Sequence, residues 1–360
     1  MRSRFLPPWP IAAPIFACLI LALKFSGVTN LHWVLLGATL AGSVLASVHH
    51  AEVVAHRVGE PFGTLVLALA ITIIEVALIV SLMLAGGPGA AELARDTAFA
   101  AVMLILNGMV GVCLLVGGMR YREQTFMLSG VSAALATLAA ITTLSLILPN
   151  YTRSHAGPSY SPSQLAFVGV ASLVLYGTFV LVQTVRHRDY FLPLDSEEKD
   201  ETHHAPRPSG RTTFFSLMLL LMGLATVVLL AKALAPTIET TVVAAGAPRA
   251  IVGVIIAAVV LLPEGLAAFR AARANRLQTS LNLALGSALA SIGLTIPAVA
   301  IVSLATGMTL TLGIDMKATA LLVLSLFVTG ISLQTGRTTI MQGMVLLVLL
   351  AAYLFTTVVP

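Results

Sequence analysis

Charged residues are scarce in this chain of 360 residues, at 10% against about 25% in a typical globular domain. Hydrophobic residues make up 58% instead. A soluble fold of this length cannot cover so much apolar surface, so long apolar runs must face lipid. Cysteine is scarce too. Cys18 and Cys113 both lie within apolar runs, which argues against a disulfide framework and a cysteine-based zinc site.

Motifs of soluble enzymes and of nucleic-acid binding are also missing. The sequence contains no phosphate-binding glycine loop and no nucleophile elbow, so we expect neither an enzyme nor a resident cofactor. The net charge of +5 comes from short basic clusters between apolar runs, as in orientation signals of membrane proteins, and does not indicate nucleic acid. Because no cleavage site follows the basic start at 1–4, the first apolar run is interpreted as a retained span.

What the sequence has in abundance is apolar runs of membrane-spanning length. A span needs roughly 20 mostly apolar residues, and about eleven runs qualify. The expected fold is therefore an all-α polytopic membrane protein of the inner (plasma) membrane, in contact with the lipid bilayer and compatible with a homo-oligomer. The predicted spans are 9–26, 30–49, 59–85, 97–118, 125–148, 163–185, 213–235, 250–269, 280–305, 317–335 and 338–358.

Basic residues give the orientation of these spans. With the N-terminus in the cytoplasm, most of the 20 Lys and Arg residues fall on the cytoplasmic side, as the positive-inside rule requires. The polar stretch DSEEKDETHHAPRPSG is then a solvated cytoplasmic linker. The predicted organisation is an extra first helix at 1–29, a five-helix repeat at 30–185, an acidic linker at 186–212 and a second five-helix repeat at 213–360.

An odd number of spans on each side of the linker predicts that the two halves enter the membrane from opposite sides, as in secondary transporters with inverted repeats. Two segments are similar to each other in sequence, as expected for two such repeats. GEPFGTLVLALAITIIEVALIV starts at Gly59, and GAPRAIVGVIIAAVVLLPEGLAAF starts at Gly246. Each opens with Gly-x-Pro and runs to one glutamate, Glu75 or Glu264. A glutamate at a matched place in oppositely directed spans indicates a shared role.

Glu75 and Glu264 are the acidic residues that lie deep inside an apolar run on both sides. A charge at the membrane centre costs about 2.5–3.5 kcal/mol on insertion scales, so intramembrane carboxylates usually have a function. Two converging carboxylates raise each other's proton affinity, and a cation in the same space offsets that repulsion and displaces protons. The alternative is a glutamate that only orients helices, but Lys24 and Lys232 are poorly placed to pair with either.

Polar groups near the two glutamates are the candidate co-ligands. Thr72 precedes Glu75 by three residues on the same helical face. Asn107 is a buried amide that needs partners. Ser287 is weighed evenly between ligand and helix packing. Oxygen atoms of this kind suit hard cations such as Ca²⁺, Na⁺ and K⁺. The predicted cation- and proton-binding set is Glu75, Glu264, Asn107, Ser287, Asn282 and Thr72, with Glu75 and Glu264 as the metal ligands.

The stretches from Val58 to Ile79 and from Leu262 to Pro297 resemble the two α-repeats of the calcium:cation antiporter superfamily. The branch that this sequence is most similar to is that of the ChaA-type bacterial calcium, sodium and potassium/proton antiporters. The resemblance implies eleven spans, an acidic linker, and a central ion-binding and proton-carrying role for Glu75 and Glu264.

The second repeat carries the family's Gly-Ser pair at Gly286-Ser287, and the first has Asn107-Gly108 at that place. The Gly-Asn that precedes the glutamate in many calcium/proton exchangers is absent. Monovalent ions therefore stay possible as the transported cation, in addition to calcium. The predicted function is a secondary cation/proton antiporter that exchanges Ca²⁺ and/or Na⁺ or K⁺ for H⁺ by alternating access.

Two other functions stay open on the sequence. His49, His50 and His56 cluster at the cytoplasmic end of the second span, where they could form the metal site of a membrane-embedded metalloenzyme, a pH sensor or a solvated edge patch. A cation channel would need a continuous polar stripe, and only isolated polar positions occur. Asp315 near the outer face is either a cation funnel or an ordinary loop charge.

Overall fold

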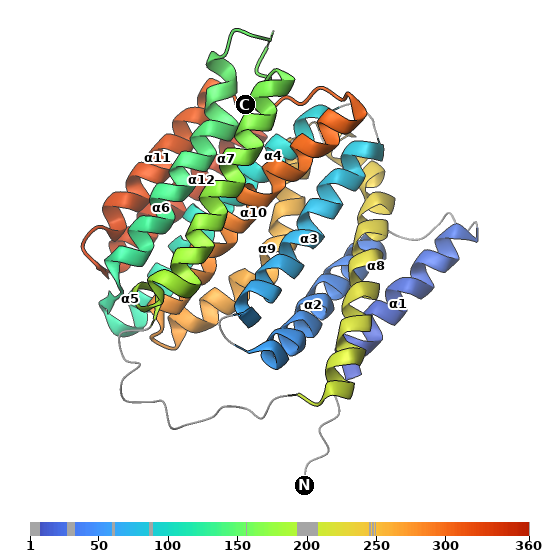
Figure 1. The fold of residues 1–360 in the computed structure, drawn as a ribbon, viewed down its shortest axis with the longest axis horizontal. Coiled ribbons are helices and arrows are strands. Elements are labelled where there is room, and N and C mark those ends of the chain that lie inside the picture. Colours follow the sequence, from blue (N-terminus) through green and yellow to red (C-terminus); the bar gives the residue numbers. More distant parts are fainter. Residues whose placement is uncertain are drawn as a thin grey trace. The chain divides into compact units, whose positions relative to one another are not determined.

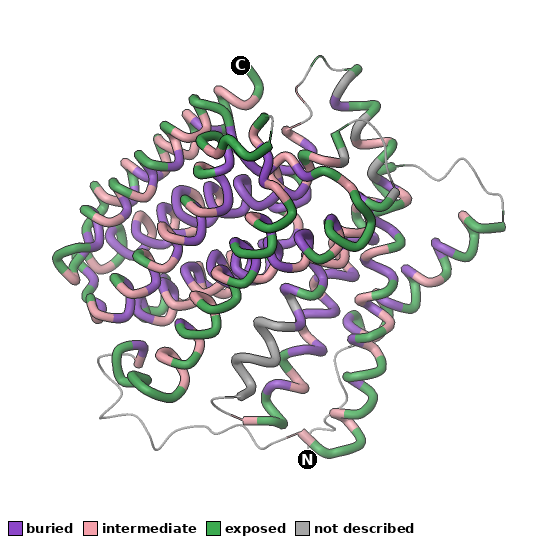
Figure 2. The backbone as a smooth tube through the Cα atoms, turned by 45° about the horizontal axis from the view of Figure 1, so that its top comes forward, coloured by how far each residue is buried: buried purple, intermediate pink, exposed green. Residues whose placement is uncertain are grey.

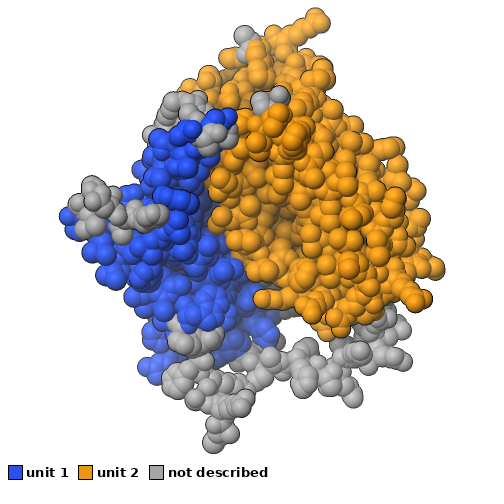
Figure 3. All heavy atoms as spheres, turned by 180° about the vertical axis from the view of Figure 1, so that it is seen from behind, with its two compact units in different colours: residues 1–87, 203–246 blue, residues 88–202, 247–360 orange. Residues whose placement is uncertain are grey.

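Helices built from the apolar runs dominate the computed structural model (Figure 1). They form because runs of Ala, Leu, Val and Ile have no polar side chains that compete for backbone hydrogen bonds, and in lipid every backbone group must be satisfied within the segment. The chain separates into two compact units, which Figure 3 colours separately. The structure describes residues 8–26, 33–59, 62–85, 89–155, 157–192, 208–244, 246, 248 and 250–359.

The first unit combines the start of the chain with the helix that follows the linker. Its two longest helices, α2 and α8, pack along each other, and Gly223 of α8 abuts Ser47 of α2 because a glycine leaves room for the hydroxyl. Helix α1 packs on both and is tied to α8 by a 2.9 Å hydrogen bond from Lys24 Nζ to the Ala233 carbonyl. The helices of this unit are α1 (Pro8–Phe25), α2 (Trp33–Val58), α3 (Phe62–Ala85) and α8 (Gly210–Ala244).

The second unit contains three spans that include a π-helical segment and several that are α-helical throughout. Its first span runs through α4 (Ala90–Met103), the π-helical segment η1 (Leu104–Met109) and α5 (Val110–Tyr121). The remaining helices are α6 (Leu128–Thr142), η2 (Thr143–Ile147), η3 (Leu148–Tyr151), α7 (Pro162–Leu181), η4 (Val182–Arg186), η5 (Arg188–Phe191), α9 (Ala250–Arg273), α10 (Leu277–Thr306), α11 (Met316–Leu333) and α12 (Ile340–Val358). A short antiparallel pair, β1 (Gln124–Thr125) with β2 (Arg337–Thr338), joins two of its loops.

The core of the second unit lies around its first span and α10. The most apolar windows of the spans Ala91–Tyr121 and Leu277–Thr306 are 78% and 67% buried, against 17% for Ile340–Val358. Figure 2 colours the backbone by the burial of each residue. Helix α10 packs against α6, α7, α9 and η1, which makes it the centre of the unit. Outer helices such as α12 leave their apolar side chains on the surface, as lipid-facing helices do.

The expected fold class is confirmed. Nine helices of the described residues are long and apolar enough to cross a membrane, and two shorter apolar helices, Trp9–Phe25 and Thr72–Leu84, fall within the two remaining predicted spans. Each compact unit contains helices from before and after the predicted linker, so the units do not coincide with the two predicted five-helix halves. The two inverted repeats stay a prediction. Most of the predicted linker at 186–212 lies outside the described residues.

Several helices extend beyond their predicted ends. The span expected at 97–118 begins at Ala90, and the charged residues of its added turns are paired, since Arg95 forms ion pairs with Glu92 and Asp96. Helix α8, expected at 213–235, runs to Ala244 through Pro236. Proline removes a single backbone hydrogen bond, and the flanking turns keep theirs.

Candidate functional site

Glu75 lies on α3, a helix whose other residues are uncharged. Its side chain is 4% exposed, and that of Thr72, one turn earlier on the same face, is 3% exposed. Helix α3 packs against α2 and α8 in the first unit. The predicted pair of a carboxyl and a hydroxyl is therefore buried on one face of one helix.

Glu264 lies on α9 in the second unit and is 8% exposed. Pro263 directly before it has no backbone N–H, so the carbonyl of Val259 loses its helical partner. The Val259 carbonyl, about one turn before the Glu264 carboxylate, is therefore available to bind a cation or to accept a hydrogen bond.

Asn107 lies in η1, where the span departs from α-helical geometry. Its side chain is fully buried, its Nδ2 lies 2.9 Å from Ser325 Oγ of α11, and its Oδ1 receives no hydrogen bond from any residue that the structure describes. π-helical turns are rare and occur frequently at functional sites. The amide expected from the sequence therefore lies at an irregular point of the backbone, a feature that the sequence did not reveal.

The residues predicted on α10 differ in their surroundings. Ser287 is half-buried, and beside it Gly286 borders open space, since a Cβ there would meet no described atom within 4 Å. In the first repeat, Gly108 of the matching pair Asn107-Gly108 is packed against Leu350 of α12. Asn282 is occupied by neighbours: its Nδ2 donates a 2.6 Å hydrogen bond to the Phe191 carbonyl.

Three of the elements that carry these residues pack on one another. Helix α9 with Glu264, segment η1 with Asn107 and helix α10 with Ser287 make pairwise contacts in the second unit. A carboxyl group, an amide and a hydroxyl thus lie on three elements that pack on one another. Hard cations prefer oxygen ligands of these kinds, so the arrangement suits a cation better than an apolar ligand.

Comparison with known proteins identifies the family. The profile of the sodium/calcium exchanger protein family matches residues 30–185 and 215–359, which is more than half of the chain. This chain belongs to the sodium/calcium exchanger family. The family expected from the residues around Glu75 and Glu264 is confirmed, and it is a family of transporters and not of enzymes.

Relatives of this exchanger-family member cover nearly all of it. It is 48% identical to y4hA of Sinorhizobium fredii (strain NBRC 101917 / NGR234), named as a candidate ionic transporter, over 100% of this chain and 98% of that protein. It is 36% identical to the sodium-potassium/proton antiporter ChaA of Escherichia coli (strain K12), over 88% of this chain and 86% of that protein. Its fold is similar to that of the crystallised H⁺/Ca²⁺ exchanger CAX, with a TM-score of 0.70 at 14% identity over 96% and 87% of the two chains.

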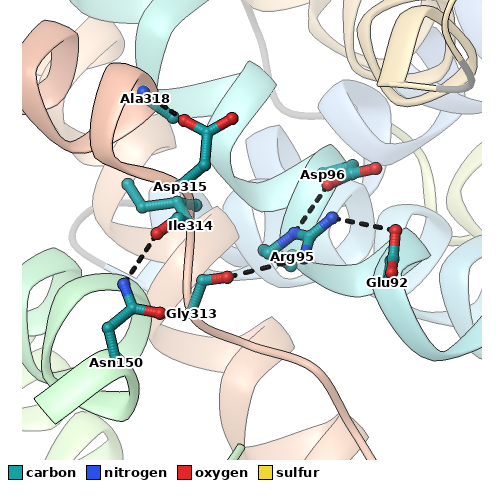
Figure 4. A network of polar contacts seen from close by, with 8 residues as sticks. All are labelled: Glu92, Arg95, Asp96, Asn150, Gly313, Ile314, Asp315 and Ala318. Carbon is teal, nitrogen blue, oxygen red and sulfur yellow. Dashed lines mark hydrogen bonds and ion pairs between the residues drawn. The ribbon is translucent and has the colours of Figure 1, made fainter. Parts of the chain in front are cut away.

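A second polar region of this exchanger-family member surrounds Arg95 of α4 (Figure 4). The guanidinium donates to Asp96 Oδ1 at 2.8 Å, to Glu92 Oε2 at 3.0 Å and to the Gly313 carbonyl at 3.4 Å. Asp315 caps α11 by accepting from the Ala318 nitrogen at 2.6 Å. A pocket of about 230 Å³ is lined by residues that include Arg95, Asp96, Asp315, Lys317 and Tyr353. Asp315 therefore caps helix α11 and also lines a pocket that contains other charged residues.

The histidines of α2 are partly inside the first unit. His50 is fully buried and its Nε2 lies 3.0 Å from the Pro10 carbonyl of α1, while the ring of His49 lies 6.1 Å from that of Trp9. The interpretation as a solvated edge patch is wrong for His50, because α1 covers it. Within the described ranges no three His, Cys, Asp or Glu side chains gather as metal ligands.

Proposed function

We propose that this member of the sodium/calcium exchanger family is a secondary cation/proton antiporter in which Glu75 and Glu264 exchange a cation for protons. The observation that carries the proposal is the position of Glu264, buried on a helix that packs against both the π-helical segment of Asn107 and the helix of Ser287. A buried carboxyl on elements that also carry an amide and a hydroxyl is suited to bind either a proton or a cation.

In the proposed cycle the protonated state and the cation-loaded state exclude each other. Burial favours the protonated form of each carboxyl, and a bound cation favours the deprotonated form. Asn107, Ser287 and Thr72 complete the oxygen ligands around the cation. If the site opens to one side of the membrane at a time, each cation that crosses must be exchanged for protons, which is alternating access.

The cargo consists of inorganic cations and protons, and no resident cofactor takes part. Similarity to a sodium-potassium/proton antiporter supports Na⁺ and K⁺, and similarity to an H⁺/Ca²⁺ exchanger fold supports Ca²⁺. The proposed location is the inner membrane with the N-terminus in the cytoplasm, which the distribution of Lys and Arg residues supports.

Inverted membrane vesicles from a host without its own cation/proton antiporters test this function. Respiration acidifies the vesicle interior, a pH-sensitive dye follows it, and Na⁺, K⁺ and Ca²⁺ are added one at a time. We expect at least one cation to release protons from vesicles with the wild-type protein and none to do so with Glu264→Gln.

Two outcomes would contradict the proposal. Vesicles that respond to no cation would exclude cation/proton exchange. An unchanged response in Glu264→Gln would exclude the proposed site. A cation channel would carry the ion along its potential without moving protons, so a cation current with no change in vesicle pH would favour that alternative.

A further inference from the structure

Asn107 is held from a helix outside the repeat segments that carry the glutamates. Its Nδ2 lies 2.9 Å from Oγ of Ser325 on α11, and both side chains are fully buried. Helix α11 packs against the π-helical segment η1, so this hydrogen bond lies within the contact between the two elements. Ser325 lies in an apolar run, and no sequence pattern connects it with Asn107.

The orientation of the Asn107 carboxamide follows from its two neighbours. The same Nδ2 lies 3.8 Å from the sulfur of Met103, one turn earlier in the helix. A thioether sulfur can only accept hydrogen bonds, so the amide nitrogen and not the oxygen belongs on that side. The oxygen must then point away from Met103 and Ser325.

The Asn107 oxygen is buried and receives no hydrogen bond from the part of the chain that the structure describes. A buried acceptor without a donor costs about 1–3 kcal/mol, and most such groups in native proteins have a partner. An amide oxygen is also a ligand for hard cations. A cation or its water would therefore satisfy the atom that the protein leaves open.

We infer that Ser325 is a positioning residue for the cation site: it binds the amide nitrogen of Asn107 and so keeps the amide oxygen directed at the cation. This inference rests on the proposed role of Asn107 as a ligand. It adds α11, through one hydroxyl, to the helices that determine how tightly the cation is bound. Without the hydroxyl the carboxamide can rotate, and the oxygen is no longer held in place.

Thr329 offers a matched control. It lies one turn after Ser325 on α11, it is also fully buried, and its hydroxyl has no hydrogen-bond partner among the described residues. The hydrogen bond that reaches Asn107 comes from Ser325. Substitution at either position removes a buried hydroxyl from α11. Only substitution of Ser325 also removes the contact with Asn107.

The test is the concentration dependence of cation-driven proton movement in vesicles. For Ser325→Ala we expect the KM for the driving cation to rise roughly three- to ten-fold, the effect of one lost hydrogen bond, with a maximal rate within about two-fold of wild type. Ser325→Thr keeps the hydroxyl and is expected to keep the KM. Thr329→Val should leave the KM unchanged. An unchanged KM in Ser325→Ala, or an equal rise in Thr329→Val, would overturn the inference.

A double substitution separates this inference from the proposed function. In an Asn107→Ala background, Ser325→Ala should raise the KM no further, because the group that it positions is gone. An equal rise in both backgrounds would show that Ser325 acts through general packing. If Asn107→Ala itself leaves the KM unchanged, the proposed ligand role fails. If it raises the KM and Ser325→Ala does not, only the role of Ser325 fails.

Discussion

Gly343 of α12 lies directly against the backbone of Leu115 in α5: a Cβ at position 343 would stand 2.5 Å from the Leu115 nitrogen and 2.8 Å from the Gly111 carbonyl oxygen. Real Cβ atoms do not approach other atoms so closely. Small residues at such crossings let membrane helices pack backbone to backbone, which is a main source of their association energy in lipid.

Gly343→Ala should therefore destabilise the second unit, because the methyl group has to push α12 away from α5. Overpacking of this kind costs about 1–3 kcal/mol. The measurement is the thermal unfolding midpoint of the purified protein in detergent. Gly330→Ala on α11 is the control, since a Cβ there meets no described atom within 4 Å. Equal midpoints for the two variants would show that the crossing is not tight.

Arg95 should matter for stability through its ion pair with the half-buried Asp96. Its side chain is 17% exposed and that of Asp96 is 19% exposed, so Arg95→Met leaves a largely buried carboxylate without its cation. We expect a loss of about 1–3 kcal/mol, as for hydrogen bonds to charged groups. Arg95→Lys should recover part of it, because lysine supplies a charge without the planar fork.

The control for Arg95 is Arg337→Met, which removes an ion pair with Glu123 whose side chains are 68% and 48% exposed. Exposed pairs contribute about 0–1 kcal/mol. Urea- or heat-induced unfolding of the three variants checks the order of stability. If Arg337→Met lowers the stability as much as Arg95→Met does, burial of the ion pair does not determine how much stability is lost.

Asn282 should prove structural although the sequence suggested a ligand. Its Oδ1 accepts from Gln278 Nε2 at 2.9 Å, and Gln278 Oε1 accepts from the Met127 nitrogen at 2.7 Å. With the bond to the Phe191 carbonyl, this chain of contacts links α10 to η5 and to Met127 at the start of α6. Asn282→Ala should lower the unfolding midpoint and leave the cation KM within about two-fold. Ser287→Ala should instead raise the cation KM and leave the unfolding midpoint unchanged. A raised KM with an unchanged unfolding midpoint in Asn282→Ala would show that Asn282 is a ligand.

The sequence predicted the spans and the buried glutamates because both rest on the cost of polar groups in lipid, which single residues reveal. The extension of α4 to Ala90 was missed, since it depends on Arg95 contacting Asp96 and the Gly313 carbonyl. The π-helical turn at Asn107 was missed because it reflects packing and not local propensity. Ser325 was missed as well. The helical spacing of Ser325, Thr329 and Ser332 in an apolar run was the available signal, and the structure shows that all three are buried.

The central claim is that Glu75 and Glu264 together couple cation movement to proton movement. The most direct measurement is the lumenal pH of liposomes that contain purified protein after a cation gradient is imposed without a proton gradient. We predict a pH change with wild type and with Glu123→Gln, whose side chain is 48% exposed, and none with Glu75→Gln or Glu264→Gln. A pH change at the wild-type rate in either of the last two variants would contradict the account.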